Sequence, residues 1–428
     1  MREMKDSGIK WIGEIPADWN VKKLKYTFAI SSGTTPKSDN LEYWDGDTPW
    51  VTPADYKTED KYVYHGRKFL SEAGLNAANL QLLPVNSIIF SKRAPIGAVA
   101  ITGAKLAINQ GCISCVPATE CDIRYYYFML SICTEQFNLL GSGTTFKEIS
   151  SKDFGNFIVP APSVLVQEKL ANYLERKCSQ IDAIIARQRE VIEKLKAYKL
   201  SVITEAVTKG LNPDVPMKDS GVEWIGEIPQ CWSGKRLADL CDRGITYGIV
   251  KLGDEDESGI KVLRCSDVNP GYIDESNIRT VTSSLSKEYN RTILRGGEVV
   301  VNVRGTLGGC SIVPEHMRGY NIAREVAMVS VTKANPQFVM YNILSKAFQS
   351  YQQYSLRGVI YTGLNIGLLS KYMLFLPSIE EQEYIVNFLN KKTTYIDRVI
   401  QKKQCLLDYL QNYKKALIYE VVTGKKEV

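Results

Sequence analysis

Two nearly identical stretches of sequence, Met4–Trp19 (MKDSGIKWIGEIPADW) and Met217–Trp232 (MKDSGVEWIGEIPQCW), decide how this chain is organised. Twelve of their sixteen positions are identical, and the second stretch begins 213 residues after the first. A second match, at an offset of 215, relates Pro162–Thr208 to Pro377–Thr423 and includes Gln-Glu and Ile-Asp pairs at the same relative places. A period of this length is too long for a solenoid repeat, so it indicates a duplicated pair of domains.

The composition is that of an ordinary globular protein, with 44% hydrophobic and 23% charged residues among 428. The formal charge of +6 is compatible with an anionic partner but does not require one. The start of the sequence has no apolar segment resembling a signal peptide, and no apolar run is long enough to span a membrane. We therefore expect a cytoplasmic protein whose ten cysteines are reduced. Because the chain has only two histidines, histidine-rich metal sites are excluded.

The segments between the repeated motifs differ in sequence but share a pattern. Pro84–Ile101 aligns without gaps on Arg295–Ile312, which places Arg93 on Arg304. Both segments alternate β-branched and small residues around a glycine-containing loop, a pattern that predicts a hairpin or two paired strands. Each half therefore has a variable domain rich in strands, followed by a helix. The predicted boundaries are 1–162 and 211–377 for the variable domains, and 163–210 and 378–428 for the helices.

The two helical segments carry an apolar residue every seven positions, which favours a coiled-coil seam. A second row is expected three positions after each of these residues. Both copies have a polar residue in the middle of the seam, and in an antiparallel pair these two residues would lie close together. They would then form a buried polar layer that fixes the register, or alternatively both would reach water. The predicted seam residues are Leu174, Ile181, Gln188, Leu195 and Val202 in the first helix and Leu389, Ile396, Lys403, Leu410 and Leu417 in the second.

A search for catalytic chemistry finds none. Cys112 and Cys115 form a C-x-x-C without a second pair at zinc-ligand spacing, and their surroundings predict a strand with buried structural thiols. Val422–Lys426 lacks the first glycine and the Ser/Thr of a phosphate-binding loop. We therefore predict no catalytic residue and no metal site.

The variable domains do contain basic residues on glycine-containing loops with aromatic residues nearby. Arginine can form two hydrogen bonds with guanine in the major groove, and lysine commonly contacts phosphates. Taken singly, each such residue is more often an ordinary solvated or ion-paired side chain, but arginine recurs at matching places in both copies. The candidate DNA-binding residues are Lys37, Lys92, Arg93 and Lys147 in the first copy and Arg264, Arg304, Arg324, Arg357 and Tyr361 in the second.

The sequence resembles the specificity subunit of type I restriction–modification enzymes. The resemblance covers essentially the whole chain and depends on four pairs of features. They are the D-S-G-x-x-W-I-G-E-I-P-x-x-W motifs (Asp6–Trp19 and Asp219–Trp232), the Gln-Glu helix starts (Pro162–Glu168 and Pro377–Glu383), the Ile-Asp pairs (Ile181–Asp182 and Ile396–Asp397) and the helix ends (Thr208–Gly210 and Thr423–Lys425).

This resemblance implies an α/β (α+β) fold with two target recognition domains joined by two long helices, which pack as an antiparallel coiled coil within a pseudo-two-fold repeat. Each recognition domain would read one half of a bipartite, asymmetric site in double-stranded DNA. The helices would set the spacing and dock two methyltransferase (modification) subunits, with restriction/translocase subunits in the full complex and no membrane partner. This chain would hold no cofactor, because S-adenosylmethionine would be bound by the methyltransferase subunits. The alternatives are a single-chain enzyme, a DNA-binding scaffold outside restriction–modification, and a scaffold that binds only protein.

Overall fold

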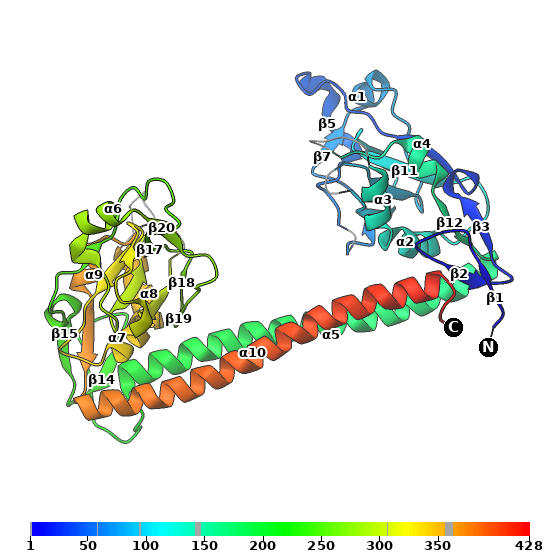
Figure 1. The fold of residues 1–428 in the computed structure, drawn as a ribbon. Helices are drawn as coiled ribbons and strands as arrows, with labels where there is room; N and C mark the ends of the chain where they lie inside the picture. Colours follow the sequence, from blue (N-terminus) through cyan, green and yellow to red (C-terminus); the bar gives the residue numbers. More distant parts are fainter. Residues whose placement is uncertain (1, 58, 94–95, 142–146, 306, 356–362) are drawn as a thin grey trace. The chain divides into compact units, whose positions relative to one another are not determined.

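The computed structural model describes residues 2–57, 59–93, 96–141, 147–305, 307–355 and 363–428. The chain forms two compact units: unit 1 combines Met1–Gln188 with Cys405–Val428, and unit 2 is Arg189–Gln404. The long helices α5 (Val164–Lys209) and α10 (Ile379–Val422) pass from one unit into the other (Figure 1). Each unit therefore contains one variable domain and about half of each long helix. None of the described helices has the length and apolarity that a membrane crossing requires.

Unit 1 contains twelve strands and several short helices in its described part. Its helices, besides those just named, are α1 (Glu72–Ala77), α2 (Ile123–Ser131), α3 (Thr134–Leu140), α4 (Ser151–Asn156), η1 (Leu24–Tyr26) and η2 (Leu41–Tyr43). Its strands are β1 (Met4–Asp6), β2 (Glu14–Pro16), β3 (Asn20–Lys23), β4 (Phe28–Ser32), β5 (Trp44–Val51), β6 (Tyr62–Val63), β7 (Lys68–Leu70), β8 (Ile88–Ser91), β9 (Val99–Thr102), β10 (Ala107–Ile108), β11 (Cys112–Pro117) and β12 (Ile158–Ala161).

Unit 2 repeats most of these elements. Its helices are α6 (Ser283–Glu288), α7 (Pro336–Leu344), α8 (Lys346–Ser355), α9 (Ile366–Lys371), η3 (Leu237–Leu240), η4 (Asn290–Thr292) and η5 (Glu315–Met317). Its strands are β13 (Met217–Asp219), β14 (Glu227–Pro229), β15 (Ser233–Arg236), β16 (Thr246–Tyr247), β17 (Ile260–Leu263), β18 (Val268–Asn269), β19 (Tyr272–Ile273), β20 (Arg279–Val281), β21 (Val299–Asn302), β22 (Cys310–Ile312), β23 (Asn321–Ile322), β24 (Val326–Val329) and β25 (Met373–Leu376).

The two variable domains have corresponding sheets, except that the main sheet of unit 1 has a fifth strand, β6, without a counterpart in the described main sheet of unit 2. The main sheet has the order β4-β11-β8-β9-β6 in unit 1 and β16-β24-β21-β22 in unit 2. A second, three-stranded sheet has the order β10-β5-β7 in unit 1 and β23-β17-β20 in unit 2, with one parallel pair in each. The antiparallel pairs β8–β9 and β21–β22 confirm the strand pairs predicted for Pro84–Ile101 and Arg295–Ile312. The duplication inferred from the sequence is therefore also a duplication of topology.

Two matched glutamines explain why a Gln-Glu pair recurs at the start of both long helices. Gln167 accepts a hydrogen bond from the backbone N–H of Asp122 (3.0 Å) and donates one to the carbonyl of Pro162 (2.8 Å). Gln382 does the same in unit 2, accepting from the N–H of Asn335 (2.9 Å) and donating to Pro377 (3.0 Å). Both side chains are buried, so each satisfies backbone groups that water does not reach.

The D-S-G motifs form hairpins that pack against the ends of the long helices. In unit 1, the β1–β2 hairpin lies beside the end of α10, where the Tyr419 hydroxyl donates to the carbonyl of Trp11 (3.1 Å) (Figure 1). In unit 2, Trp232 packs with Val207 near the end of α5 in one buried cluster. Gly210 and Gly424 end the two helices with φ values of 76° and 73°, the left-handed conformation that favours glycine.

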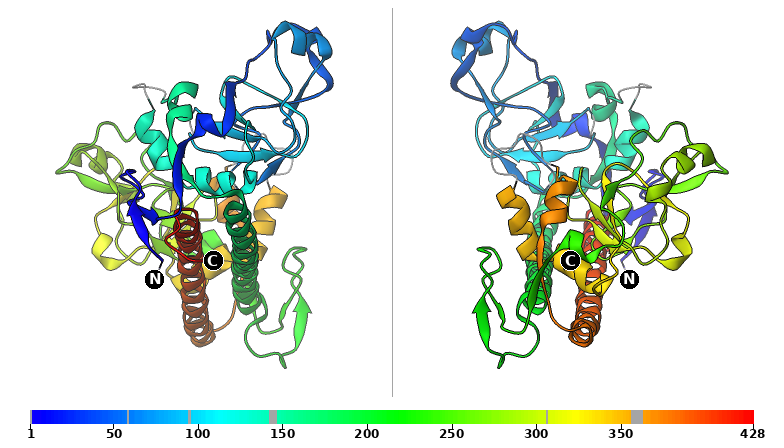
Figure 2. Two further views of the ribbon diagram at one scale, coloured as in Figure 1. Left: turned by 90° about the vertical axis from the view of Figure 1, so that its right-hand side faces the viewer. Right: turned by 90° about the vertical axis from the view of Figure 1, so that its left-hand side faces the viewer.

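The long helices lie side by side and run in opposite directions (Figure 2). In unit 1 the Lys414 ammonium binds the Asp182 carboxylate (2.6 Å), and in unit 2 Lys199 binds Asp397 at the same distance. Asp182 lies earlier on α5 than Lys199, whereas its partner Lys414 lies later on α10 than Asp397. This order is the pattern of antiparallel helices. Lys414 and Lys199 are themselves equivalent positions of the repeat, so the same contact is made in each unit.

The predicted second seam row was placed one residue too early. Ile184 and Tyr198, which lie in the predicted row, are 46% and 49% exposed. The buried row instead comes four positions after most residues of the first row, as with Cys178, Ile185 and Ile192 on α5. In the first row, Leu174, Ile181, Leu389, Ile396 and Leu417 are buried, whereas Gln188, Leu195, Val202, Lys403 and Leu410 are partly buried.

Candidate nucleic-acid interface

Four chain segments of each variable domain meet at one place, which we call the junction. In unit 1, the N–H of Lys92 donates to Gly111 (3.0 Å), and the carbonyl of Lys92 accepts from Ile149 (3.1 Å). In unit 2, the N–H of Val303 donates to Glu325 (2.9 Å), and its carbonyl accepts from Leu364 (2.8 Å). The junction comprises Ser32–Thr34, Lys92–Arg93, Asn109–Gly111 and Lys147–Ile149 in unit 1, and Tyr247–Ile249, Val303–Arg304, Ala323–Glu325 and Gly363–Leu364 in unit 2.

A glycine lets the first of these segments approach the third. A Cβ atom on Gly33 would lie 1.9 Å from the carbonyl oxygen of Ile108, and one on Gly248 would lie 1.8 Å from that of Ile322. Real Cβ atoms do not approach a backbone oxygen so closely, so only glycine fits at either position. The same backbone frame is thus present in both units, although the side chains attached to it differ.

In unit 1 the junction is basic but partly neutralised. The Glu148 carboxylate binds both the Lys92 ammonium (3.0 Å) and Arg93 Nε (2.9 Å), and Lys92 also donates to the Ser32 hydroxyl (3.3 Å). Partial burial raises the pKa of Glu148, but the hydrogen bonds from Lys92 and Arg93 outweigh it and hold that pKa below its ordinary value. Glu148 is therefore ionised at neutral pH and competes with any anionic ligand for the two cations.

In unit 2 the arginine of the junction contacts an aromatic ring instead of a carboxylate. The Arg304 guanidinium lies over the ring of Tyr247, 5.5 Å from its centroid, and Tyr247 accepts a hydrogen bond from the N–H of Ile366 (3.0 Å) through its hydroxyl. Among the described residues no carboxylate forms an ion pair with Arg304 or with Arg324. Arg324 is exposed, and its backbone N–H donates to Ile249 within the junction (2.9 Å).

The remaining candidates are distributed as follows. Lys37 and Lys147 are exposed, and only Lys147 belongs to the junction. Arg264 lies elsewhere and is bound by the buried carboxylate of Asp267, whose hydrogen bonds raise the arginine's pKa. Arg357 and Tyr361 lie outside the described residues. The structure thus brings Lys92, Arg93, Lys147, Arg304 and Arg324 to the junctions and leaves Lys37 and Arg264 away from them.

Sequence reasoning missed Tyr247 and Glu148, which flank the arginines. Neither could be found from local pattern, because Tyr247 lies 57 positions from Arg304 in the sequence and Glu148 lies 55 positions from Arg93. The glycine after Tyr247 could have pointed to this segment from the sequence, because Gly248 and Gly33 are equivalent positions at the repeat offset of 215.

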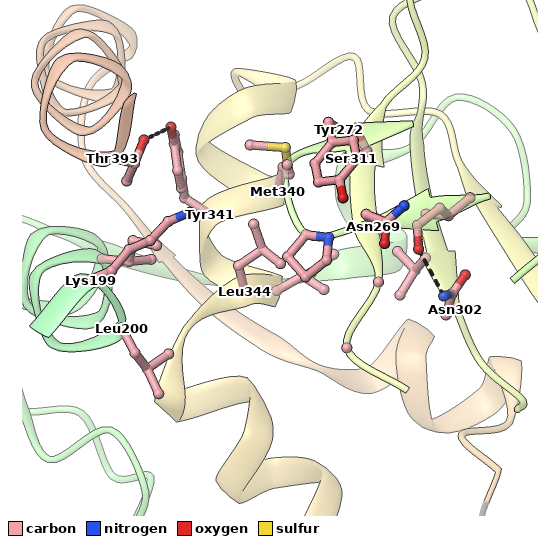
Figure 3. Close-up of a pocket in the computed structure, with 18 of the residues that line it drawn as sticks. Lys199, Leu200, Asn269, Tyr272, Asn302, Ser311, Met340, Tyr341, Leu344 and Thr393 are labelled. Carbon is pink, nitrogen blue, oxygen red and sulfur yellow. Dashed lines mark hydrogen bonds between the residues drawn. The ribbon is translucent and has the colours of Figure 1, made fainter. Parts of the chain in front are cut away.

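Unit 2 also has a groove of about 1040 Å³ between the variable domain and the long helices (Figure 3). Tyr341 from α7 lines it, with its hydroxyl donating to Asn390 (2.7 Å) and lying 3.3 Å from Thr393, both on α10. In unit 1 the position of Asn390 is taken by Glu175, which binds Lys61 and Arg124. The connection between domain and helices is therefore ionic in unit 1 and uncharged at the equivalent place in unit 2.

The C-x-x-C motif lies in strand β11, as predicted. Cys112 and Cys115 are buried free thiols, and burial raises the pKa of Cys112 to about 12 and that of Cys115 further. Thiols with such pKa values are unreactive at neutral pH. No cluster of three or more His, Cys, Asp and Glu side chains suited to a metal ion occurs in the described part of the chain.

Comparison with known proteins gives concordant results. The profile of the family described as "Type I restriction modification DNA specificity domain" matches residues 16–194 and again residues 229–407. The specificity subunit of type I restriction enzyme MjaIX from Methanocaldococcus jannaschii is 26% identical, covering 97% of this chain and 95% of its own length. The EcoBI specificity subunit from Escherichia coli is 27% identical over 71% of this chain and 65% of its own.

A solved structure has the same fold. It comes from work on assembly and conformational transition of the type I R-M system, and it aligns with a TM-score of 0.72 at 14% identity, covering 96% of this chain and 99% of its own. The two profile matches begin 213 residues apart, which is the offset of the D-S-G motifs. The chain therefore belongs to the family of type I restriction–modification DNA specificity domains and carries two copies of that domain.

Proposed function

We propose that this chain is the non-catalytic DNA-recognition subunit of a type I restriction–modification complex, and that each variable domain reads one half of a bipartite, asymmetric target. The observation that carries this proposal is the junction. Its backbone hydrogen bonds recur in both units, while Ser32 and Lys92 are replaced by Tyr247 and Val303 beside the shared arginine, Arg93 or Arg304. A constant backbone arrangement that carries different side chains would allow the two variable domains to recognise different DNA sequences.

The chemistry of the two junctions favours different kinds of contact. Arg304 is preoriented by Tyr247 and forms no ion pair with a carboxylate of the described residues, so its guanidinium donors can bind a guanine edge. Lys92 and Arg93 share one carboxylate, and such exchangeable cations suit phosphate contacts that position the DNA. We infer direct base reading by Arg304 and phosphate contacts by Lys92 and Arg93.

The long helices would dock the methyltransferase subunits and set the distance between the half-sites. The row three positions after the seam residues supports docking, because four of its apolar side chains are exposed: Ile184, Leu406 and Tyr413 in unit 1, and Tyr198 in unit 2. Tyr198 and Tyr413 are equivalent positions of the repeat, as are Ile184 and Val399. Equivalent apolar rows in the two units suit two copies of one partner.

In this proposal the reaction is carried out by the partners. The methyltransferase subunits would bind S-adenosylmethionine and transfer the methyl group, and restriction/translocase subunits would join them in the full complex. This chain would hold no cofactor of its own.

Replacing residues 20–155 with the first variable domain of another family member tests the proposal. We expect one half of the methylated motif to change and the other to stay the same, as read by mapping methylated positions in the genome of the host cell. A control replacement within residues 233–370 should change the other half. A change in both halves after either replacement would show that the domains are not independent readers.

Two further measurements separate the rival functions. The purified chain, incubated with DNA and S-adenosylmethionine, should transfer no methyl group, whereas a single-chain enzyme would. A scaffold that binds only protein would show no DNA binding, whereas phosphate contacts give an affinity that falls steeply with salt.

A further inference from the structure

Unit 2 has a second basic site, a cleft of about 670 Å³ lined by three arginines. Arg243, Arg291 and Arg295 all line it, together with Thr246. The cleft borders the junction along the chain, because Thr246 immediately precedes Tyr247 on strand β16. Side chains alternate along a strand, so Thr246 faces the side of β16 opposite to Tyr247. We call this site the arginine cleft.

A local insertion creates the cleft. In unit 1, strand β4 pairs continuously with β11 from Phe28 to Ser32. In unit 2 the corresponding pairing is interrupted between Cys241, which pairs with Val331, and Thr246, which pairs with Met328. Four residues, 242–245, therefore stand opposite two, 329–330, and Arg243 lies in this bulge. Bulges redirect side chains and are common beside functional sites.

The other arginines also have no counterpart in the first copy. Continuing the ungapped alignment of Pro84 on Arg295 places Leu80 on Arg291. The matching hydrogen bonds of Leu83 to Leu106 and of Leu294 to Tyr320 support this alignment. The shared fold therefore does not need arginine at these positions, since unit 1 has an apolar residue and a proline there.

A buried carboxylate orients the cleft. Glu298, whose side chain is only 3% exposed, binds Arg243 Nη2 (2.5 Å) and accepts a hydrogen bond from the backbone N–H of Arg295 (2.7 Å). Arg243 Nη1 donates to the carbonyl of Ile293 (3.3 Å). The neighbouring Asp242 carboxylate is hydrogen-bonded to Ser330, and its pKa is lowered by that bond. Three arginines line the cleft, and Glu298 neutralises one of them, Arg243, which leaves an excess of positive charge.

Two donors at the cleft have no partner among the described residues. Arg243 Nε and the Thr246 hydroxyl are both buried and make no hydrogen bond there. Glu298 Oε2 also lacks a partner, but it is an acceptor and cannot bind an anion. Both donor atoms are covered in this structure, so an anion in the cleft would be bound first by the exposed guanidinium groups of Arg291 and Arg295.

We propose that the arginine cleft binds a phosphate group, and that its source is the backbone of the DNA bound by the same variable domain. The inference rests on the proposed function for the identity of the phosphate. The cleft would fix the position of the second half-site without reading its sequence, because phosphate contacts carry no base information. It would also make DNA binding by the second variable domain more dependent on salt than DNA binding by the first.

The test uses the full chain in complex with its methyltransferase subunits. Arg291→Gln combined with Arg295→Gln is the variant of choice, since both side chains are exposed and Glu298 keeps its bond to Arg243. The control is Lys287→Gln combined with Lys346→Gln, which removes the same charge from exposed positions outside the cleft. DNA affinity is measured over a series of salt concentrations, and the thermal midpoint is measured with inorganic phosphate against chloride at equal ionic strength.

We expect the slope of log affinity against log salt to become shallower by about 0.9 in the cleft variant and to stay unchanged in the control. Phosphate should raise the midpoint of the wild type more than that of the cleft variant. An unchanged slope together with a phosphate effect would assign the cleft to free phosphate and overturn the backbone assignment. An unchanged slope without a phosphate effect would overturn the site altogether. If the wild type bound no DNA, the proposed function would fail, while the phosphate measurement would still decide whether the cleft binds the anion.

Discussion

Glu148→Gln should strengthen DNA binding, although it removes a side chain from the proposed interface. Glu148 holds Lys92 and Arg93 at 3.0 and 2.9 Å, and the three side chains are 37%, 12% and 48% exposed. Partly exposed ion pairs of this kind contribute about 0.2–1 kcal/mol each. DNA must displace both pairs in the wild type and neither in the variant. The expected gain is therefore about 0.4–2 kcal/mol, or roughly 2- to 30-fold in affinity.

The salt dependence gives a second reading of the same change. Because DNA displaces both ion pairs in the wild type, the same two cations contact phosphates in both proteins, so the affinity should rise while the slope of log affinity against log salt stays about the same. Glu120→Gln is the matched control, because Glu120 is exposed and lies outside the junction. The assay is titration of labelled DNA carrying the methylated motif at several salt concentrations. An unchanged affinity in Glu148→Gln would refute the idea that Lys92 and Arg93 contact phosphates.

The pH dependence follows from the lowered pKa of Glu148. Because the folded-state pKa lies below the unfolded one, the ion pairs stabilise the fold above the unfolded pKa. That contribution is lost as the pH falls through the folded value. Protonated Glu148 resembles glutamine, so the wild type and Glu148→Gln should converge in DNA affinity only at pH values below the ordinary glutamate pKa. Convergence near neutral pH would contradict the ionised state assigned here.

Three other outcomes are expected. Arg304→Ala should weaken binding by about 1–3 kcal/mol and relax one position of the motif if it reads a base, as methylation mapping would show; an unchanged motif and affinity would make this segment framework only. Leu389→Ala, at a fully buried position, should lower the free energy of unfolding by about 2–5 kcal/mol, whereas Leu406→Ala, 40% exposed, should change it far less in denaturant titrations; equal losses would contradict the seam assignment. Inserting seven residues into both long helices near Gln188 and Gln404 lengthens each helix by about 10.5 Å and should increase the distance between the half-sites by about three base pairs. An active variant that keeps the original spacing would refute the proposal that the helices set this distance.

The sequence was sufficient for the parts of the fold that the duplication repeats. The pairing of β8 with β9 and of β21 with β22 followed from one ungapped alignment, and so did the equivalence of Arg93 and Arg304. The two helices followed from their heptads. These features are predictable because they depend on local alternation and on comparison of one half with the other.

The second seam row could not be chosen from hydrophobicity alone. Ile184 and Val191 at a spacing of three are as apolar as Ile185 and Ile192 at a spacing of four, and only packing of the two helices distinguishes them. The partners of the candidate arginines were equally hidden, because Glu148 and Tyr247 are distant in sequence. Arg264 is the exception: Asp267, only three residues away, is a partner that sequence spacing could have suggested.

The division of unit 1 between two distant stretches of chain has a consequence for the order of synthesis. Residues 405–428, which complete unit 1, emerge from the ribosome 217 positions after Gln188. At about 5–20 residues per second, this delay is about 10–40 s. During that interval Trp11 has no Tyr419 to bind it, and the β1–β2 hairpin has no α10 to cover it. Unit 2, which is continuous from Arg189 to Gln404, can close before the unit that was begun first. The nascent chain thus has to keep its earliest apolar segments from aggregating until its latest residues arrive, and a ribosome that stalls before residue 405 leaves unit 1 incomplete however much of the protein has been made.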